Sequence, residues 1–329
     1  MARVVRTDRE LELPGVDAAL RADGHELVLL SEGVTENELV AATADARLLL
    51  MCYTPITRRV IEGARELKAI VKYGVGIDAI DLAAARSRGV PVANVPDYAE
   101  ETVAEGAFAL MMALAKKLKP LQRAMDSEGW VWPTGEWLAA DLAGKTAGVV
   151  GLGRIGSAFA RMAAGFRMRV LSYDPYVPAA THRNLHAMLA ESDFVSIHCV
   201  LNDETRHLVG EAELRAMKPG AFLINVARGA IVDESALLRS LESGRLAGAA
   251  LDVYSREPLS RRGHPLSALY AMDNVILSPH LTFYTRAAMA RLEAETLERC
   301  REALEGRPLE VRSRDPRLRA QTRGVRFVD

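Results

Sequence analysis

Short apolar runs alternate with helix-like segments along most of the chain. We expect the apolar runs to be strands, at residues 26–30, 46–51, 69–73, 90–95, 147–150, 169–173, 194–198, 221–226, 247–252 and 274–277. Strands that alternate with helices form parallel sheets with helices on both faces. The pattern therefore predicts an α/β fold with two doubly wound parallel-sheet domains.

Two longer helical segments mark the expected domain limits. Residues 102–115 are apolar on most of the helix circumference, which indicates burial between domains or between subunits. Residues 285–304 form an amphipathic helix that we expect to return to the first domain, because chain ends often lie close together. We therefore assign residues 1–97 plus 285–329 to a substrate-binding domain and residues 98–284 to a nucleotide-binding domain.

Charge and cysteine content narrow the class of protein. The 329 residues include 42 Lys and Arg against 43 Asp and Glu, so the net charge of −1 favours neither nucleic acid nor an anionic membrane. Three widely separated cysteines indicate free thiols in a reducing compartment, and no 18 apolar residues run together. We expect a cytoplasmic protein without nucleic-acid or membrane partners. The arginine-rich residues 312–329 are expected to form a solvated tail, with a lid or an anion contact as the alternative.

One glycine turn carries the first chemical signal. The predicted strand 147–150 runs into a G-x-G-x-x-G turn and then a helical segment; the turn comprises Gly151, Leu152, Gly153, Arg154, Ile155 and Gly156. In this context the first glycine permits the tight turn, the second lets the backbone approach a pyrophosphate, and the third lets helix and strand pack closely. The turn predicts a dinucleotide site.

The acid that follows the next strand identifies the dinucleotide. Asp174 lies 18 residues after Gly156, at the end of the predicted strand 169–173. A carboxylate there accepts the two ribose hydroxyls of adenosine and repels a 2′-phosphate. Residues 175–178 offer no adjacent arginine to neutralise such a phosphate. We therefore expect NAD as the cofactor.

Several polar residues follow other predicted strands. Ligands of doubly wound sheets bind beyond the carboxyl ends of the strands, and this edge is expected to carry His198, Arg228, Asp252 and His280, with Glu257 on a neighbouring loop. Hydride transfer to or from a nicotinamide requires a partner group that handles a proton, and imidazole titrates near neutral pH. His280 is therefore a candidate acid–base group.

These motifs resemble the D-isomer-specific 2-hydroxyacid dehydrogenase family. The resemblance rests on the turn 151–156, on Ala227-Arg228-Gly229, on Glu257-Pro258 and on Pro279-His280, and it extends over nearly the whole chain. It implies a Rossmann NAD-binding domain inserted into a flavodoxin-like substrate-binding domain. The implied activity is an NAD-dependent, reversible reduction of a small 2-oxo acid to a D-2-hydroxy acid.

The resemblance also implies roles for individual residues. Arg228 would hold the substrate carboxylate and polarise the ketone, His280 would act as acid and base, and Glu257 would raise the pKa of that imidazole. The other implied site residues are Val75 and Gly76 for the substrate carboxylate, Tyr53, Phe283 and Tyr284 for the pocket wall, and Thr102, His198, Ala227 and Asp252 for the cofactor. No metal is expected, since hydride transfer needs none.

Within the family the chain looks most like the C-terminal-binding-protein branch, which includes transcriptional corepressors and enzymes. Phe283-Tyr284 stands where the corepressors carry Trp-Tyr. A dinucleotide-sensing corepressor or scaffold that binds peptides through its first domain is therefore the alternative function. A homodimer is implied, with Trp130, Trp132 and Trp137 as the contact; packing of these residues on the chain's own core is the other interpretation.

Overall fold

The computed structural model describes residues 1–328, which form two compact units. One unit comprises Met1–Ala99 and the chain from Thr285 onward, and the other comprises Glu100–Tyr284. These limits differ by two residues from the boundaries expected at 97 and 98. Each unit has its own parallel sheet, so the predicted α/β fold with two parallel sheets is confirmed.

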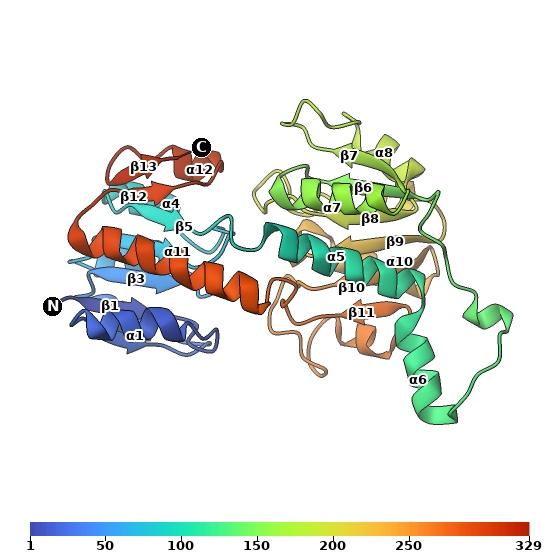
Figure 1. Cartoon of the computed structure of the whole chain (residues 1–329), viewed down its shortest axis with the longest axis horizontal. Helices are drawn as coiled ribbons and strands as arrows, with labels where there is room; N and C mark the ends of the chain where they lie inside the picture. The colour runs from blue at the N-terminus through green and yellow to red at the C-terminus, as the bar shows by residue number, and fades with distance from the viewer. Residues whose placement is uncertain (329) are drawn as a thin grey trace. The chain divides into compact units, whose positions relative to one another are not determined.

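The first unit contains a five-stranded sheet with the order β2-β1-β3-β4-β5 (Figure 1). Its strands are β1 (Arg3–Arg6), β2 (Glu26–Leu29), β3 (Leu48–Met51), β4 (Ala69–Lys72) and β5 (Val92–Asn94). This order is that of flavodoxin-like sheets. Strand β1 was not among the predicted strands, because Arg3 and Arg6 interrupt its apolar pattern. Arg6 is nevertheless buried, since its guanidinium donates to both carboxylate oxygens of Asp17 at 3.0 and 2.8 Å.

Five helices accompany this sheet, and the longest comes from the distant end of the chain. They are α1 (Pro14–Ala22), α2 (Glu36–Thr43), α3 (Arg58–Gly63), α4 (Leu82–Ser87) and α11 (Arg286–Glu305). Helix α11 begins after Thr285, whose hydroxyl accepts the N–H of Ala288 at 3.2 Å as an N-cap. It packs on β3 and β4 (Figure 1). The expected return of residues 285–304 to the first domain is what the structure shows.

The prediction that residues 312–329 form a solvated tail is wrong for residues 312–328, which the structure describes. The chain after α11 forms β12 (Leu309–Val311), α12 (Pro316–Arg319) and β13 (Val325–Phe327), with β12 and β13 paired in parallel. Leu318 is fully buried. The amide of Gln321 donates to the carbonyl of Val92 at 2.9 Å and accepts its N–H at 2.7 Å, which satisfies the outer edge of β5. The chain after α11 therefore packs on the edge of β5 through β12 and Gln321.

The second unit contains a six-stranded parallel sheet with the order β11-β10-β9-β8-β6-β7. Its strands are β6 (Thr146–Val150), β7 (Arg169–Tyr173), β8 (Phe194–Ile197), β9 (Ala221–Asn225), β10 (Leu246–Leu251) and β11 (Val275–Leu277). All six were predicted to within two residues. Numbered within the unit, the order is 2-1-3-4-5-6, so its first five strands repeat the order of the first sheet.

The helices of the second unit include the apolar segment predicted at 102–115. They are α5 (Glu100–Ala115), α6 (Leu118–Glu128), α7 (Arg154–Gly165), α8 (Leu185–Glu191), α9 (Glu211–Ala216) and α10 (Glu234–Glu242), with short 3-10 turns at Gly135–Trp137, Gly229–Ile231 and Ser267–Ala271. Helix α5 packs along α7 (Figure 1), and the rings of Phe108 and Phe159 lie 6.1 Å apart between them. Its burial is therefore explained at least in part by its own unit. No helix in the described part of the chain has the length and apolar character needed to cross a membrane.

Candidate functional site

The glycine turn joins β6 to α7, as its spacing predicts. Gly151 adopts a φ of +92°, and a Cβ built on it would lie 2.6 Å from the backbone nitrogen of Cys199. A Cβ on Gly156 would lie 2.0 Å from the carbonyl oxygen of Gly151. Neither position accepts a side chain, because in both cases backbone rather than a flexible side chain occupies the space.

Gly153 differs from the other two glycines of the turn. It is the N-cap of α7, it is exposed, and a Cβ built on it would meet no atom within 4 Å. Open space at a helix N-terminus, where backbone N–H groups and the positive end of the helix dipole face outward, suits an anion. Arg154 and Ile155 form the first turn of the same helix and are half-buried. The turn thus has the form of a pyrophosphate cradle.

Asp174 follows β7 beside this turn. Its Oδ2 accepts the N–H of Leu152 at 2.9 Å, and its Oδ1 accepts the N–H of Tyr176 at 2.9 Å. The carboxylate is therefore tied to the glycine turn and remains half-exposed. Such a carboxylate can accept ribose hydroxyls with the remaining capacity of its oxygens.

The structure brings an arginine to this place that sequence reasoning missed. Arg183 lies outside residues 175–178, yet its guanidinium approaches the carbonyl oxygens of Asp174 and Val177 at 3.4 Å and that of Pro178 at 3.2 Å. The chain turns back after Pro178, and Tyr173 forms a bridge with His182. A contact made by such a turn has no signal in the local sequence.

His198 and His280 lie in very different surroundings. His198 directly follows β8, its Nε2 lies 2.8 Å from the hydroxyl of Ser196, and its Nδ1 has no hydrogen-bond partner among residues 1–328. Burial lowers the pKa of His198 to about 3. This imidazole is neutral at physiological pH, so it is unsuited to donate a proton in a reaction.

His280 forms a hydrogen-bonded pair with Glu257. The Nδ1 atom of His280 lies 2.9 Å from Oε2 of Glu257, and Oε1 of Glu257 accepts the N–H of Tyr254 at 2.9 Å. A carboxylate only accepts hydrogen bonds, so Nδ1 of His280 is the donor to Glu257. Nε2 is then the nitrogen that can exchange a proton with a substrate. His280 has a φ of +59° and side-chain exposure of 21%. The pair has the geometry of an oriented acid–base group.

Two effects act on the acid of this pair. Burial raises the pKa of Glu257, whereas the hydrogen bond to His280 and the positive charges of His280 and Arg228 lower it, and the net result is a pKa below the usual value. The carboxyl is therefore ionised at neutral pH. An ionised Glu257 stabilises a positive charge on the adjoining imidazole.

Arg228 reaches the same region from the loop after β9. Its Nη1 donates to the carbonyl of Ala227 at 2.8 Å, and Asn225 holds the loop by donating to the carbonyl of Arg228 at 2.9 Å. A Cβ on Gly229 would lie 1.9 Å from the carbonyl carbon of Tyr254. The glycine therefore allows the Arg228 loop to lie directly against the loop that leads to Glu257.

Asp252 holds the segment that follows His280. Its fully buried carboxylate accepts the N–H of Leu281 at 2.9 Å, the N–H of Thr282 at 3.1 Å and the hydroxyl of Thr282 at 2.6 Å. Sequence reasoning gave this residue a cofactor contact and missed its role in the backbone after the histidine. The left-handed backbone of His280 lies directly before this anchor.

The remaining predicted site residues of the second unit differ in their burial and in their contacts. Phe283 is buried and meets the ring of His280 edge to face at a centroid distance of 6.4 Å, whereas Tyr284 is exposed. Thr102 is buried in the first turns of α5, and the N–H of Ala227 donates to Asn225 at 3.1 Å. The structure thus assembles Arg228, Glu257 and His280 with Phe283 beside them.

The three substrate residues predicted in the first unit lie on loops after β3 and β4. Tyr53 and Val75 are unusually exposed for their size, at 42% and 38%. No hydrogen bond among residues 1–328 uses the N–H of Val75 or Gly76, although Asn94 donates to the carbonyl of Val75 at 2.7 Å. Two consecutive N–H groups without an internal acceptor can donate to an anion such as a carboxylate.

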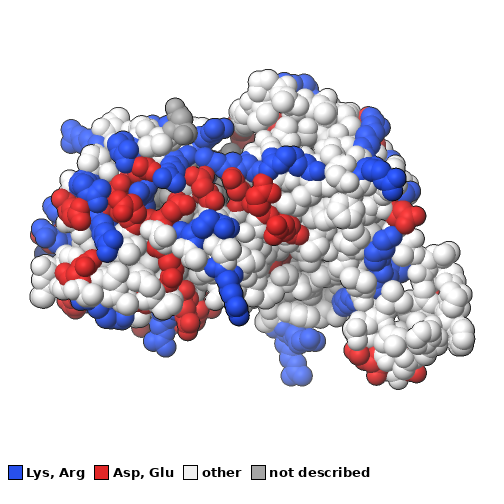
Figure 2. All heavy atoms as spheres, in the orientation of Figure 1, with Lys and Arg blue, Asp and Glu red and all other residues white. Residues whose placement is uncertain are grey.

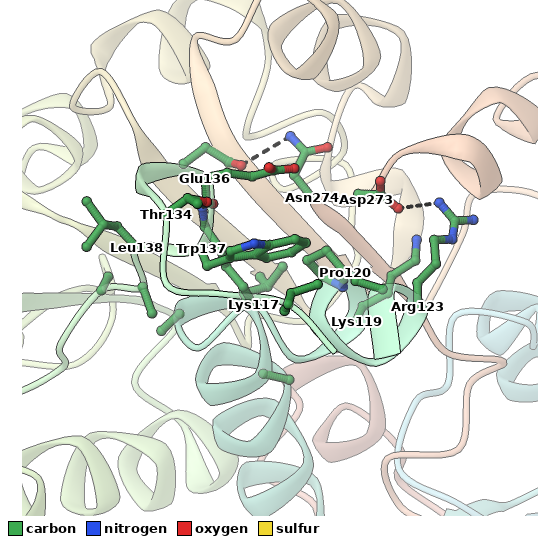
Figure 3. A pocket seen from close by; sticks show the side chains of 18 of the residues that line it. Lys117, Lys119, Pro120, Arg123, Thr134, Glu136, Trp137, Leu138, Asp273 and Asn274 are labelled. Carbon is green, nitrogen blue, oxygen red and sulfur yellow. Dashed lines mark hydrogen bonds and ion pairs between the residues drawn. The ribbon is translucent and has the colours of Figure 1, made fainter. Parts of the chain in front are cut away.

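An irregular arm of the second unit carries the three tryptophans. Trp130 and Trp132 are 67% and 75% exposed, so for these two the interpretation as packing on the chain's own core is wrong. Trp137 lines a hollow of about 930 Å³ with α6 (Figure 3). The rim of the hollow includes the ion pair of Arg123 with Asp273. In Figure 2 the arm shows few charged atoms on the visible face.

Comparisons with known proteins agree with this geometry. The sequence model of the D-isomer specific 2-hydroxyacid dehydrogenase NAD binding domain matches residues 108–282. The chain is 41% identical to a glyoxylate reductase of Korarchaeum cryptofilum over 76% of this chain and 78% of that one. It is 36% identical to a D-3-phosphoglycerate dehydrogenase of Methanocaldococcus jannaschii over 85% of this chain and 54% of that one. The crystal structure of a D-lactate dehydrogenase from Aquifex aeolicus, complexed with NAD and lactic acid, superposes with a TM-score of 0.83 at 31% identity, covering 92% of this chain and 96% of that one.

Proposed function

The chain belongs to the D-isomer-specific 2-hydroxyacid dehydrogenase family, and on this premise we propose how its residues carry out the reaction. The protein is an NAD-dependent enzyme that reversibly reduces a small 2-oxo acid to the D-2-hydroxy acid. The observation that supports the residue assignment best is the pair of His280 and Glu257, 2.9 Å apart, with the charge of Arg228 acting on Glu257.

The second unit fits NAD. Gly153 leaves open space at the start of α7, and Asp174 lies beside the turn with a half-exposed carboxylate. We assign the pyrophosphate to the turn 151–156 and the adenosine ribose to Asp174, with Thr102, His198, Ala227 and Asp252 toward the rest of the cofactor. When bound, NADH supplies the hydride for C2 of the substrate.

The substrate is held by its carboxylate and its ketone. The fork of the Arg228 guanidinium suits two oxygens at once, and its charge polarises the carbonyl. In the same proposal the N–H groups of Val75 and Gly76 donate to the substrate carboxylate, because no internal acceptor uses them. We keep Tyr53, Phe283 and Tyr284 as the residues that the resemblance assigns to the substrate wall.

His280 handles the proton. Its Nδ1 is engaged by Glu257, so Nε2 donates the proton to the ketone oxygen during reduction and accepts it during oxidation. Glu257 fixes the ring and the tautomer and stabilises the imidazolium that reduction requires. His198 is excluded from this role by its low pKa.

The assignment is tested by the variant His280→Ala. NADH oxidation is followed with glyoxylate, pyruvate, hydroxypyruvate and branched 2-oxo acids. We expect kcat to fall about 10² to 10⁴-fold while the affinity for NADH stays within a factor of about two. The matched control is His186→Ala, since His186 pairs with Glu213 at the protein surface. Unchanged turnover in His280→Ala would remove this histidine from the mechanism.

The corepressor-like alternative is not favoured, because the named relatives are enzymes. The resemblance to the C-terminal-binding-protein branch stays a prediction. Tight NADH binding without turnover of any 2-oxo acid in the panel would instead support the alternative function, a dinucleotide-sensing corepressor or scaffold. The cytoplasmic location inferred from the three cysteines, none of which forms a disulfide within residues 1–328, is part of this proposal.

A homodimer is also part of the proposal. The exposed indoles of Trp130 and Trp132 and the exposed Leu138, next to a hollow of about 930 Å³, support a second copy as the occupant of this face. Sedimentation of the double variant Trp130→Ser, Trp132→Ser is expected to shift the protein toward monomer. A dimer of undiminished stability would exclude the arm as the contact.

A further inference from the structure

The loops at the switch point of the first sheet are joined by one acidic residue. The order β2-β1-β3-β4-β5 reverses direction between β1 and β3, and doubly wound sheets bind ligands in the crevice beyond the strand ends at such a point. Asp8 follows β1, and residues 52–54 follow β3. What Asp8 contacts therefore decides how this crevice is used.

The carboxylate of Asp8 is saturated by backbone N–H groups and threonine hydroxyls of the chain itself, among them the hydroxyl of Thr7, which donates to Oδ2 at 2.5 Å. Its Oδ2 accepts the N–H of Cys52 at 2.9 Å and that of Tyr53 at 3.0 Å. Its Oδ1 accepts the N–H of Thr54 at 3.1 Å and its hydroxyl at 2.8 Å. Asp8 is 4% exposed. Three consecutive N–H groups around one anion are the arrangement that loops elsewhere offer to a phosphate.

The position of Asp8 is itself fixed by contacts of the backbone around it. Its backbone has a φ of +53°, in the left-handed region that Asp and Asn tolerate better than most residues. The buried phenol of Tyr73 donates to the carbonyl of Thr7 and approaches that of Asp8 at 3.3 Å. The carboxylate therefore reaches the loop from a rigid strand end.

Lys72 holds the opposite side of the same loop. Its buried ammonium donates to the carbonyl of Cys52 at 2.6 Å and to Sγ of Cys52 at 3.1 Å. The same ammonium lies 5.4 Å from the centre of the Tyr53 ring, within the range of a cation–π contact. The loop is thus held by an anion at its N–H groups and by a cation at its carbonyl, and the exposed ring of Tyr53 is fixed over the cation.

We propose that Asp8 is a positioning residue for substrate selectivity: its carboxylate, together with Lys72, fixes the loop 52–54 so that Tyr53 forms a rigid wall that favours 2-oxo acids with small substituents. This inference rests on the proposed function, which assigns Tyr53 to the substrate wall. Asp8 itself does not touch the substrate. Its effect is to remove the freedom by which Tyr53 would make room for a larger side chain.

The test is the variant Asp8→Asn, which keeps the side-chain size and the tolerance of a positive φ. The new amide replaces one acceptor oxygen with a donor that faces N–H groups, so the loop loses part of its anchor. We expect kcat/KM for glyoxylate to fall about tenfold or more, mainly through KM. The ratio of kcat/KM for 4-methyl-2-oxopentanoate to that for glyoxylate is expected to rise about tenfold.

Two further variants separate positioning from general destabilisation. Thr54→Val removes only the hydroxyl bond to Oδ1 and is expected to change the ratio in the same direction by a smaller factor. Asp17→Asn perturbs a buried carboxylate of the same unit that pairs with Arg6 and contacts no residue of the loop, so the ratio is expected to stay at the wild-type value.

Hydrogen exchange supplies a readout that does not depend on activity. The amides of residues 52–54 are expected to exchange faster in Asp8→Asn and at the wild-type rate in Asp17→Asn. An unchanged substrate ratio in Asp8→Asn, or equal changes in Asp8→Asn and Asp17→Asn, would overturn the inference while leaving the proposed function intact. A wild-type enzyme that reduces no 2-oxo acid in the panel would overturn the proposed function instead.

Discussion

The switch points of the two sheets use the same topology in opposite ways. In the second unit the turn after β6 leaves open space at Gly153, and the acid beside the turn, Asp174, remains half-exposed. In the first unit Asp8 closes the crevice between β1 and β3, because its carboxylate accepts hydrogen bonds from the loop after β3. In our proposal the strand end of the second unit receives an anionic ligand, whereas that of the first unit holds an anion of its own. Strand order alone therefore does not predict a ligand site; the side chains at the strand ends decide.

The largest expected effect comes from displacing the glycine turn of the second unit. In Gly156→Ala the new Cβ would lie 2.0 Å from the carbonyl oxygen of Gly151, so the turn must move. We expect the affinity for NADH, measured by fluorescence titration, to fall by a factor of about 100 or more, since more than two good hydrogen bonds to the pyrophosphate depend on the turn.

A control for this variant lies at the other end of the same helix. Gly165 has no atom within 4 Å of a built Cβ and no positive φ. Alanine is the better helix former by about 1 kcal/mol, so Gly165→Ala is expected to bind NADH normally. Normal NADH affinity in Gly156→Ala would show that the close approach of helix and strand does not shape the cradle.

A smaller effect is expected from removing the half-exposed acid beside this turn. In Asp174→Ser we expect NADH affinity to fall about tenfold, because the ribose hydroxyls lose a charged acceptor. NADPH affinity is expected to rise, because a repelling charge disappears near Arg183, whose guanidinium approaches the carbonyls of residues 174, 177 and 178. Titration with both cofactors measures the ratio.

Asp193 provides the control for Asp174. It accepts the N–H of Thr146 at 2.8 Å at the opposite end of the strands of the same sheet, so Asp193→Asn is expected to leave the cofactor ratio unchanged. If NADPH affinity stayed as low in Asp174→Ser as in the wild type, Arg183 would have no part in cofactor choice.

The smallest effect is expected at the β5 edge of the sheet of the first unit. Gln321 gives β5 the two hydrogen bonds that a further strand would give. Gln321→Ala is expected to lower the free energy of unfolding by about 1 to 2 kcal/mol, because the edge groups of Val92 return to water or stay unpaired. Denaturant unfolding measures the change, and cofactor affinity is expected to stay constant because this edge belongs to the first unit.

The sequence predicted most strands, because a strand buried on both faces is a continuous apolar run. It did not predict β1, where Arg6 is buried through its pair with Asp17, a contact made only after folding. It also gave the wrong state for the arginine-rich end, where Leu318 is buried and Gln321 hydrogen-bonds to β5 although their neighbours are charged. Local pattern fails where a polar residue obtains its partner from a distant segment.

For the candidate site, the sequence by itself determined the chemistry of the parts. The spacing of the glycines, the acid after the second strand and the motifs around Arg228, Glu257 and His280 are local features, because each needs only a turn at the end of a strand. Tertiary structure decided how they work. It made His198 neutral by burial, paired His280 with Glu257, turned Asp252 toward the backbone of residues 281 and 282, and used Asp8 to close the first crevice. These outcomes depend on which loops meet, and that is set by the order of strands in the sheets, which no short stretch of sequence contains.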